Sequence, residues 1–359
     1  MWFIELFAGT SALSRVLIGG MAGNRPRIES PVGYMGAKND LAADILRRAE
    51  LRPGQGADRL IWNDASTIGH VTRTVLGPDG ALVADILASW EGSDPRALWF
   101  VLRDQGPPKD PVAFAASWLW LQARAASGVP VWWDCTPSAG QLVSFNGDGN
   151  GPYPAWQATC QSAELVQHVA GKAAGQKMAP NPRLIQHNSS CVGNAGQKDG
   201  PDPALKRARG QDGEQPGGQN RAIGGIRSPA TIARRILALR AALCGHNIEI
   251  VTMRAADYAG LLYGDIGEAV ANGIRVVVYM DPPYQGATGY ELGCPRDTVL
   301  GMAMDLRRAG AEVIVSEAEG LPLVGWHQVQ LPSRRKPEWL TMSHLPRRAM
   351  GDLFVERAA

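Results

Sequence analysis

The sequence predicts an α/β protein built on a doubly wound, mostly parallel sheet. Near the start, an apolar run over 2–7 is followed by a helical pattern over 11–18. Toward the end, the apolar run over 275–280 is typical of a buried parallel strand, and it stops at Asp281. Between these parts, residues 171–227 are rich in Gly, Gln, Asn and Pro, with almost no apolar periodicity. The simplest architecture is therefore one α/β domain that an insertion interrupts.

The other elements follow from the same two patterns. Short apolar runs predict strands, and apolar residues spaced three and four apart predict helices. The predicted strands cover residues 2–7, 60–64, 248–251, 275–280, 311–316, 325–331, 338–343 and 352–356. The predicted helices cover residues 11–18, 36–51, 110–127, 229–244, 255–263 and 296–309. Pro53 stops the second of these helices, and the last three strands suit one edge of the sheet.

The length of 359 residues suits about two folding units. We place residues 1–110 and 228–359 in one discontinuous α/β domain, and residues 111–227 in the insertion. Within the insertion, residues 171–227 carry nine Lys or Arg against four Asp or Glu, a larger excess than the +2 of the whole chain. Two interpretations of this segment stay open, a solvated mobile loop and a surface that binds a polyanion.

The composition excludes several classes of protein. With 45% hydrophobic and 19% charged residues, the chain can build a core, which excludes disorder throughout. No apolar run reaches the ~18 residues of a membrane helix, and the N-terminus has no signal-peptide pattern, so we expect a cytoplasmic protein without a membrane partner. The five cysteines are scattered and the six histidines do not pair at ligand spacing, so we expect neither disulfides nor a metal site.

Two motifs follow the first two predicted strands. Glycine in the run Glu5 to Ser11 lets the backbone approach a ligand closely, although a tight turn needs glycine for steric reasons alone. Asp64 follows the strand over 60–64, where an acid can accept hydrogen bonds from a ribose. An N-cap for the next helix is an equally good explanation of Asp64, and both roles can coexist.

Two further motifs suit the binding of a planar amine and of an anion. Asp281-Pro282-Pro283-Tyr284 fixes a carboxylate, free carbonyls and an aromatic ring at the end of a strand, which suits a planar amine. A rigid turn with a surface tyrosine is the weaker alternative. Tyr34 to Lys38 opens the helix over 36–51, where backbone N–H groups and the ammonium can hold an anion. By itself, that lysine would more simply be a solvated side chain.

Together these motifs resemble those of S-adenosylmethionine-dependent methyltransferases. Glu5 to Ser11 is similar to their Phe-x-Gly-x-Gly motif, and Asp281 to Tyr284 matches the catalytic motif of amino-methylating DNA enzymes, most often N6-adenine ones. Tyr34 to Lys38 resembles a segment of the Dam-like adenine methyltransferases, but here it follows the first motif instead of preceding it. The resemblance implies a Rossmann-like methyltransferase sheet with an antiparallel edge strand, interrupted by a loop-rich target-recognition insertion.

The resemblance also implies roles for individual residues. Asp281, Pro282, Pro283 and Tyr284 would hold the target base. The cofactor S-adenosylmethionine would contact a larger set, which comprises Phe7, Ala8, Gly9, Thr10, Ser11, Tyr34, Lys38, Asp64, Asp257 and Tyr258. Within that set, Phe7 and Gly9 would line the methionine end, Lys38 would face the carboxylate, Asp64 the ribose, and Asp257 with Tyr258 the adenine.

The expected reaction is methylation of the N6 amine of an adenine flipped out of double-stranded DNA. The basic insertion would contact DNA phosphates, whereas Trp118 and Trp120 fit a helix core better than a stacking platform. A monomer is compatible with these expectations. Three alternatives remain: a methyltransferase for RNA, one for a protein amide, and a DNA-binding relative without turnover. The first two usually carry Asn where this chain has Asp281, and Ser11 in place of the second glycine is the one motif residue that favours the third.

Overall fold

The computed structural model describes most of the chain outside its centre. The described residues are 1–23, 25–33, 38–94, 97–98, 101–102, 105–124, 228–284, 292–331 and 337–344. The predicted insertion beyond Arg124 and the predicted strand over 352–356 lie outside them.

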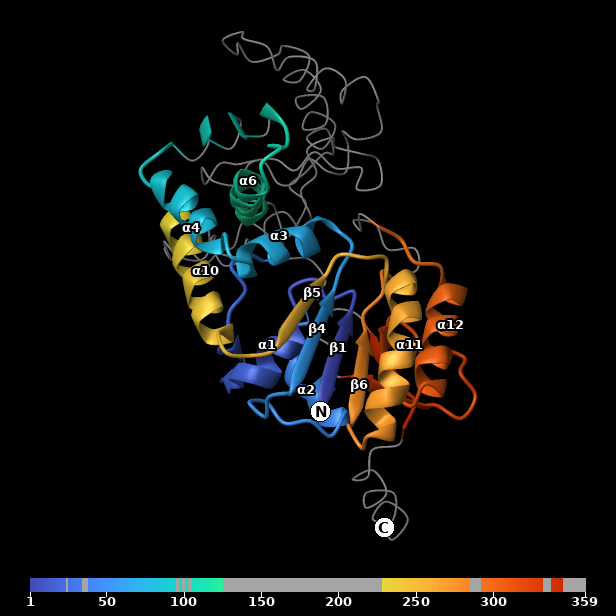
Figure 1. Ribbon diagram of the computed structural model, residues 1–359. Helices are drawn as coiled ribbons and strands as arrows, with labels where there is room; N and C mark the ends of the chain where they lie inside the picture. Colours follow the sequence, from blue (N-terminus) through green and yellow to red (C-terminus); the bar gives the residue numbers. More distant parts are fainter. Residues whose placement is uncertain are drawn as a thin grey trace, which may run out of the picture.

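A seven-stranded sheet forms the centre of the molecule (Figure 1). Its strands are β1 (Trp2–Leu6), β4 (Arg59–Asn63), β5 (Ile248–Val251), β6 (Val276–Met280), β7 (Glu312–Glu317), β8 (His327–Leu331) and β9 (Glu338–Met342). Their spatial order is β5-β4-β1-β6-β7-β9-β8. The first five run parallel, β9 is antiparallel to β7, and β8 is antiparallel to β9. The predicted α/β class and mostly parallel sheet are therefore confirmed, with antiparallel strands at one edge.

Helices cover both faces of this sheet. On one face lie α1 (Ala12–Gly19) and α2 (Ala42–Arg48), and on the other α11 (Ala255–Ala271) and α12 (Arg296–Arg308). Strand β6 shows why: Val276, Val278 and Met280 pack with α11 and α12, whereas Val277 and Tyr279 pack with α1 and α2. Because successive side chains of a strand point to opposite faces, an entirely buried strand needs apolar residues at every position.

Four more helices share a second core beside the sheet. They are α3 (Thr67–Leu76), α4 (Gly80–Ser89), α6 (Pro111–Arg124) and α10 (Pro229–Leu243), and Figure 1 shows them grouped near the β5 edge. Trp118 and Trp120 of α6 are fully buried there, which confirms their expected place in a core. The short strands β2 (Met21–Ala22) and β3 (Arg25–Pro26) pair as a separate hairpin. The first helix of the predicted insertion, α6, therefore packs in one core with helices that precede and follow the insertion.

Some boundaries differ from the sequence-based expectations. Helix α2 begins at Ala42 instead of residue 36, because Lys38 to Leu41 form a turn before it. Helix α11 extends to Ala271, eight residues beyond the expected end. Its three internal glycines lower helix propensity, but the burial of Leu262, Ile266 and Ala269 against the sheet outweighs that cost.

The topology determines where a ligand can bind. Along the sheet, the strand order reverses between β1 and β6, so the connections leave their carboxyl ends in opposite directions. In open α/β sheets, ligands bind in the crevice at such a switch point. In the described part of the chain, no helix is long and apolar enough to cross a membrane.

Candidate functional site

A cavity of about 560 Å³ opens at the carboxyl ends of the parallel strands. It runs from Asp281 after β6, past the turn after β1 and residues 63–66 after β4, to residues 254–257 at the start of α11. Of the residues singled out in the sequence, it brings together Phe7, Ala8, Gly9, Thr10, Lys38, Asp64, Asp257, Asp281 and Pro283. Its volume lies in the usual range for small-molecule sites.

Four other residues singled out in the sequence are described but do not line this cavity. Ser11 is buried at the start of α1, and Pro282 is buried within its motif. Tyr258 packs in the core under α11, where its hydroxyl donates to Glu249 Oε1 at 3.2 Å. Tyr284 is turned toward Lys38 and Glu338. Tyr34 lies outside the described residues.

The turn after β1 has an unusual backbone. Phe7, Gly9 and Ser11 all adopt positive φ angles, of 62°, 50° and 50°. Such angles are rare for residues with a side chain, and they cluster at functional sites where surrounding contacts hold them. No described atom lies within 4 Å of the position that a Cβ of Gly9 would take, so the left-handed φ angle, and not crowding, favours glycine at this position.

Asp64 joins two of the loops that line the cavity. Its Oδ2 accepts a hydrogen bond from the backbone N–H of Gly9 at 2.7 Å, and its Oδ1 accepts from the N–H and hydroxyl of Ser66. Ser66 is the N-cap residue of α3, so Asp64 supports that helix start through Ser66. Asp64 thus clamps the β1 turn to the β4 loop, and its contact with a ribose stays a prediction.

The buried side chain of Arg15 also stabilises the turn after β1. The side chain is 2% exposed and donates to the carbonyls of Thr10, at 2.8 Å, and Ile28, at 2.6 Å. It also donates to Asn39 Oδ1 at 2.8 Å, which ties the β1 turn to the segment just after Lys38. Burial lowers the pKa of Arg15 to about 10, so it stays charged at neutral pH.

Replacing Arg15 with methionine is expected to destabilise the protein by about 2–4 kcal/mol, because two buried carbonyls and one amide oxygen lose their donor. Urea unfolding of the variant and the parent measures this difference. Arg48→Met, at an exposed position on α2, is the matched control. A loss no larger than that of the control would contradict this role of Arg15.

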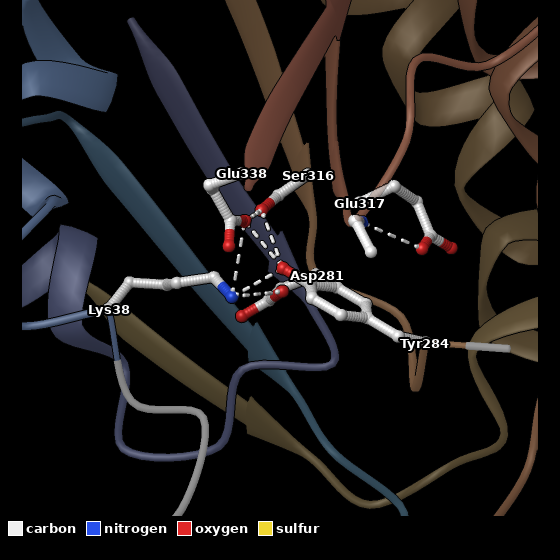
Figure 2. Close-up of polar contacts among 7 residues, drawn as sticks. Lys38, Asp281, Tyr284, Ser316, Glu317 and Glu338 are labelled. Carbon is white, nitrogen blue, oxygen red and sulfur yellow. Dashed lines mark hydrogen bonds and ion pairs between the residues drawn. The ribbon is translucent and has the colours of Figure 1, made fainter. Parts of the chain in front are cut away.

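Lys38, Asp281, Tyr284, Ser316 and Glu338 form one polar cluster at the Asp281 end of the cavity (Figure 2). The Lys38 Nζ lies 3.1 Å from Asp281 Oδ1 and 3.3 Å from Glu338 Oε1, and it donates to the Tyr284 hydroxyl at 2.6 Å. The hydroxyls of Tyr284 and Ser316 both donate to Glu338 Oε1. Residues from four separate parts of the chain therefore meet in one hydrogen-bonded and ion-paired cluster.

Burial controls the electrostatics of this end of the cavity. It raises the pKa of Asp281 to about 6, although the Lys38 ammonium opposes the shift. Burial likewise raises the pKa of Glu5 to about 7 and that of Glu317 to about 7. Burial and the carboxylates nearby also raise the pKa of Tyr284, so its hydroxyl is neutral and donates. Carboxyl groups whose pKa values approach neutrality are common at functional sites.

Several residues at the site were not singled out in the sequence. Asn63 is 1% exposed and lines the cavity; its Oδ1 accepts from the N–H of Met253, and its Nδ2 makes no hydrogen bond with the described residues. Glu338 and Ser316 complete the cluster around Lys38. Asn63 directly precedes Asp64 at a strand end, which is a signal that could have identified it. Glu338 has no such local signal, because it begins β9, a short strand between β7 and β8 that no motif precedes.

The arrangement suits an elongated, cationic small molecule beside a planar amine. Four carboxyl groups and two cationic side chains line the cavity, which favours a ligand with net positive charge. Asp281 offers an acceptor for N–H hydrogens at one end. Among the described residues, no group of three His, Cys, Asp or Glu side chains is placed to hold a metal ion.

Comparison with known proteins adds no relative to this picture. Neither a scan against models of protein families nor a search among curated proteins finds a match to this chain.

Proposed function

We propose that the protein transfers a methyl group from S-adenosylmethionine to the N6 amine of an adenine in double-stranded DNA. The observation that carries this proposal is the position of Asp281 to Tyr284. The motif follows β6 at the switch point of the sheet, its first residue lines the cavity, and the Asp281 N–H contacts the Leu6 carbonyl of β1 at 3.4 Å. An acceptor for the target amine thus lies beside the turn that would hold the cofactor.

The lining residues fit S-adenosylmethionine, whose sulfonium and ammonium outweigh its carboxylate. The excess of acidic groups along the cavity favours that net charge. The orphan Asn63 Nδ2 offers a buried donor that a ligand in the β4 half would satisfy. The open space at Gly9 allows close approach near β1. Phe7, Gly9, Asp64 and Asp257 would then hold the cofactor, with its reactive end toward Asp281.

Asp281 would activate the amine by accepting its hydrogens. The lone pair of an adenine amine is delocalised into the ring, so the amine is a weak nucleophile. Hydrogen bonds to the Asp281 carboxylate and the Pro282 carbonyl localise that lone pair on nitrogen. When bound, S-adenosylmethionine supplies an electrophilic methyl group. Since a base within a duplex cannot reach the cavity, the target must flip out of the stack.

Duplex DNA is the proposed partner, and the basic residues of 171–227 would bind its phosphates. These residues lie outside the described part of the chain. The alternative acceptors, an RNA base or a protein amide, present a similar planar amide or amine. The Asp at 281 and the basic insertion favour DNA over both.

The pH dependence of the reaction tests the proposed state of Asp281. Its pKa of about 6 means that the carboxyl is mostly protonated below that pH and becomes a weaker acceptor for the amine hydrogen that it holds. We expect kcat/KM to fall about tenfold per pH unit below pH ~6 and to stay level above it. Cofactor affinity, measured by calorimetry over the same range, separates weaker binding from slower transfer. A profile that is flat from pH 5 to 7.5 at constant affinity would contradict this assignment.

The acceptor class can be tested directly. The protein is incubated with S-adenosylmethionine carrying a tritiated methyl group and, in separate reactions, unmethylated genomic DNA, bulk RNA or a cell-free protein extract. The proposal predicts label in DNA and none above background in the other two. Label only in RNA or only in protein would overturn the DNA assignment while keeping the transfer reaction.

A further inference from the structure

Glu338 lies at the centre of the polar cluster, although the proposed chemistry does not use it. Its side chain is 8% exposed, and one of its oxygens, Oε1, receives the hydroxyls of Tyr284 and Ser316 and lies 3.3 Å from Lys38 Nζ. A carboxylate that is buried this deeply costs free energy unless several donors compensate it. Here three donors from three other parts of the chain meet it.

The Lys38 ammonium is shared between two carboxylates. Lys38 donates a hydrogen bond to the Tyr284 hydroxyl, and the same ammonium forms ion pairs with both Asp281 and Glu338. Asp281 is also the group that must accept the target amine, so Lys38 and the amine compete for the same carboxylate. A second carboxylate beside Lys38 gives the ammonium a partner that it keeps when Asp281 turns to the amine.

Tyr284 is held by the same glutamate. Its ring lies under Lys38, with Nζ 4.7 Å from the ring centroid, and its hydroxyl donates to Glu338. Because both ends of the side chain are fixed, the ring has one orientation beside Asp281. A change at Glu338 would therefore reach the target base through Tyr284 as well as through Lys38.

We propose that Glu338 is a positioning residue for methyl transfer, which fixes the Tyr284 hydroxyl and gives the Lys38 ammonium a second carboxylate partner. The inference rests on the proposed function, because it assumes that Asp281 accepts the target amine. Glu338 itself touches neither the cofactor nor the base. Its effect passes through Lys38 and Tyr284.

Two substitutions separate these effects. Glu338→Gln keeps an oxygen for the two hydroxyls but removes the negative charge that raises the pKa of Asp281, whereas the ion pair between Lys38 and Asp281 remains and stabilises the ionised carboxylate. The charged or titratable groups that influence Asp281 are otherwise the same, namely Lys38, Glu5, Glu317, Tyr279 and Tyr284. We expect the acid limb of kcat/KM to move about one unit below pH ~6 and kcat to fall about tenfold. Glu338→Ala also frees Tyr284, so KM for DNA is expected to rise about tenfold beyond that of Glu338→Gln.

A measurement that needs no activity tests the link to Asp281. Burial raises the pKa of Asp281 from 3.8 to about 6. The contribution of its carboxyl group to the free energy of unfolding is therefore fully present below pH ~4 and is lost as the pH rises through about 6. The difference in unfolding free energy between the parent and Asp281→Asn records this loss. In a Glu338→Gln background we expect the loss to level off about one pH unit lower.

These measurements distinguish a failure of the proposed methyl transfer from a failure of the proposed role of Glu338. Glu319→Gln, whose side chain is 79% exposed, is the control and is expected to change neither the acid limb nor the unfolding curve. If no acceptor is ever labelled, the proposed function fails, but the unfolding curves still decide whether Glu338 acts on Asp281. If Glu338→Gln shifts neither the pH of the acid limb nor the pH at which the stability difference caused by Asp281→Asn levels off, the positioning role is wrong.

Discussion

Replacing Asp281 with alanine is expected to lower the rate of methyl transfer at least 100-fold, or by about 2.7–4 kcal/mol of transition-state stabilisation. In the proposed reaction this carboxylate accepts a hydrogen of the target amine and localises its lone pair, and among the described carboxyl groups only Asp281 directly follows β6 and lines the cavity. The loss should appear in kcat, because the interaction strengthens as nitrogen becomes cationic. Single-turnover kinetics with labelled cofactor measures it.

Asp281→Asn and Asp265→Ala complete this experiment. The asparagine variant keeps the shape of the side chain but not its charge, so it should be as slow as the alanine variant. It should also be no less stable than the parent at pH 8, since a buried carboxylate with a pKa near 6 destabilises the fold there. Asp265 is exposed on α11 and serves as the matched control. Full activity in Asp281→Asn would show that the acceptor is another group.

The second large effect is expected at Asp64. Asp64→Ala removes the acceptor of the Gly9 N–H, at 2.7 Å, and of Ser66, so the β1 turn loses its link to the β4 loop. Hydrogen bonds to a charged group contribute about 1.5–3 kcal/mol each. We expect the affinity for S-adenosylmethionine to fall roughly 10–100-fold, as measured by isothermal titration calorimetry.

The same titrations need a control carboxylate whose removal should leave the affinity for S-adenosylmethionine unchanged. Asp85 is exposed on α4, away from the cavity, and Asp85→Ala should bind the cofactor like the parent. Circular dichroism spectra of both variants check that the fold is intact. Unchanged cofactor affinity in a folded Asp64→Ala variant would remove the β4 loop from the proposed cofactor site.

Much of the sheet could be predicted because its signals are local. The run over 275–280 is apolar at each position but the first, which only a strand buried on both faces requires, and it ends at Asp281 as the structure has it. Once the strands were placed, the rule that parallel strands bind ligands at their carboxyl ends brought Gly9, Asp64 and Asp281 to one edge. Each of these inferences used only neighbouring residues and a general rule of topology.

The contacts within the site could not be predicted because they depend on tertiary packing. Lys38 and Tyr284 are 246 residues apart. They meet because α2, which follows Lys38, packs against β6, which precedes Tyr284. Phe7 and Ser11 adopt left-handed backbone without being glycine, which no sequence pattern announces. Tyr258, expected at the cofactor adenine, donates its hydroxyl to Glu249, a contact with no local sequence signal, and its contact with a cofactor stays a prediction.

The most direct test of the central claim identifies the methylated nucleoside. DNA labelled by the protein is digested to nucleosides, and the position of the methyl group is determined by mass spectrometry, with Asp281→Ala run in parallel. The proposed function predicts N6-methyldeoxyadenosine in the parent reaction and its absence in the variant. A methyl group on cytosine, or N6-methyldeoxyadenosine that persists in the Asp281→Ala reaction, would contradict it.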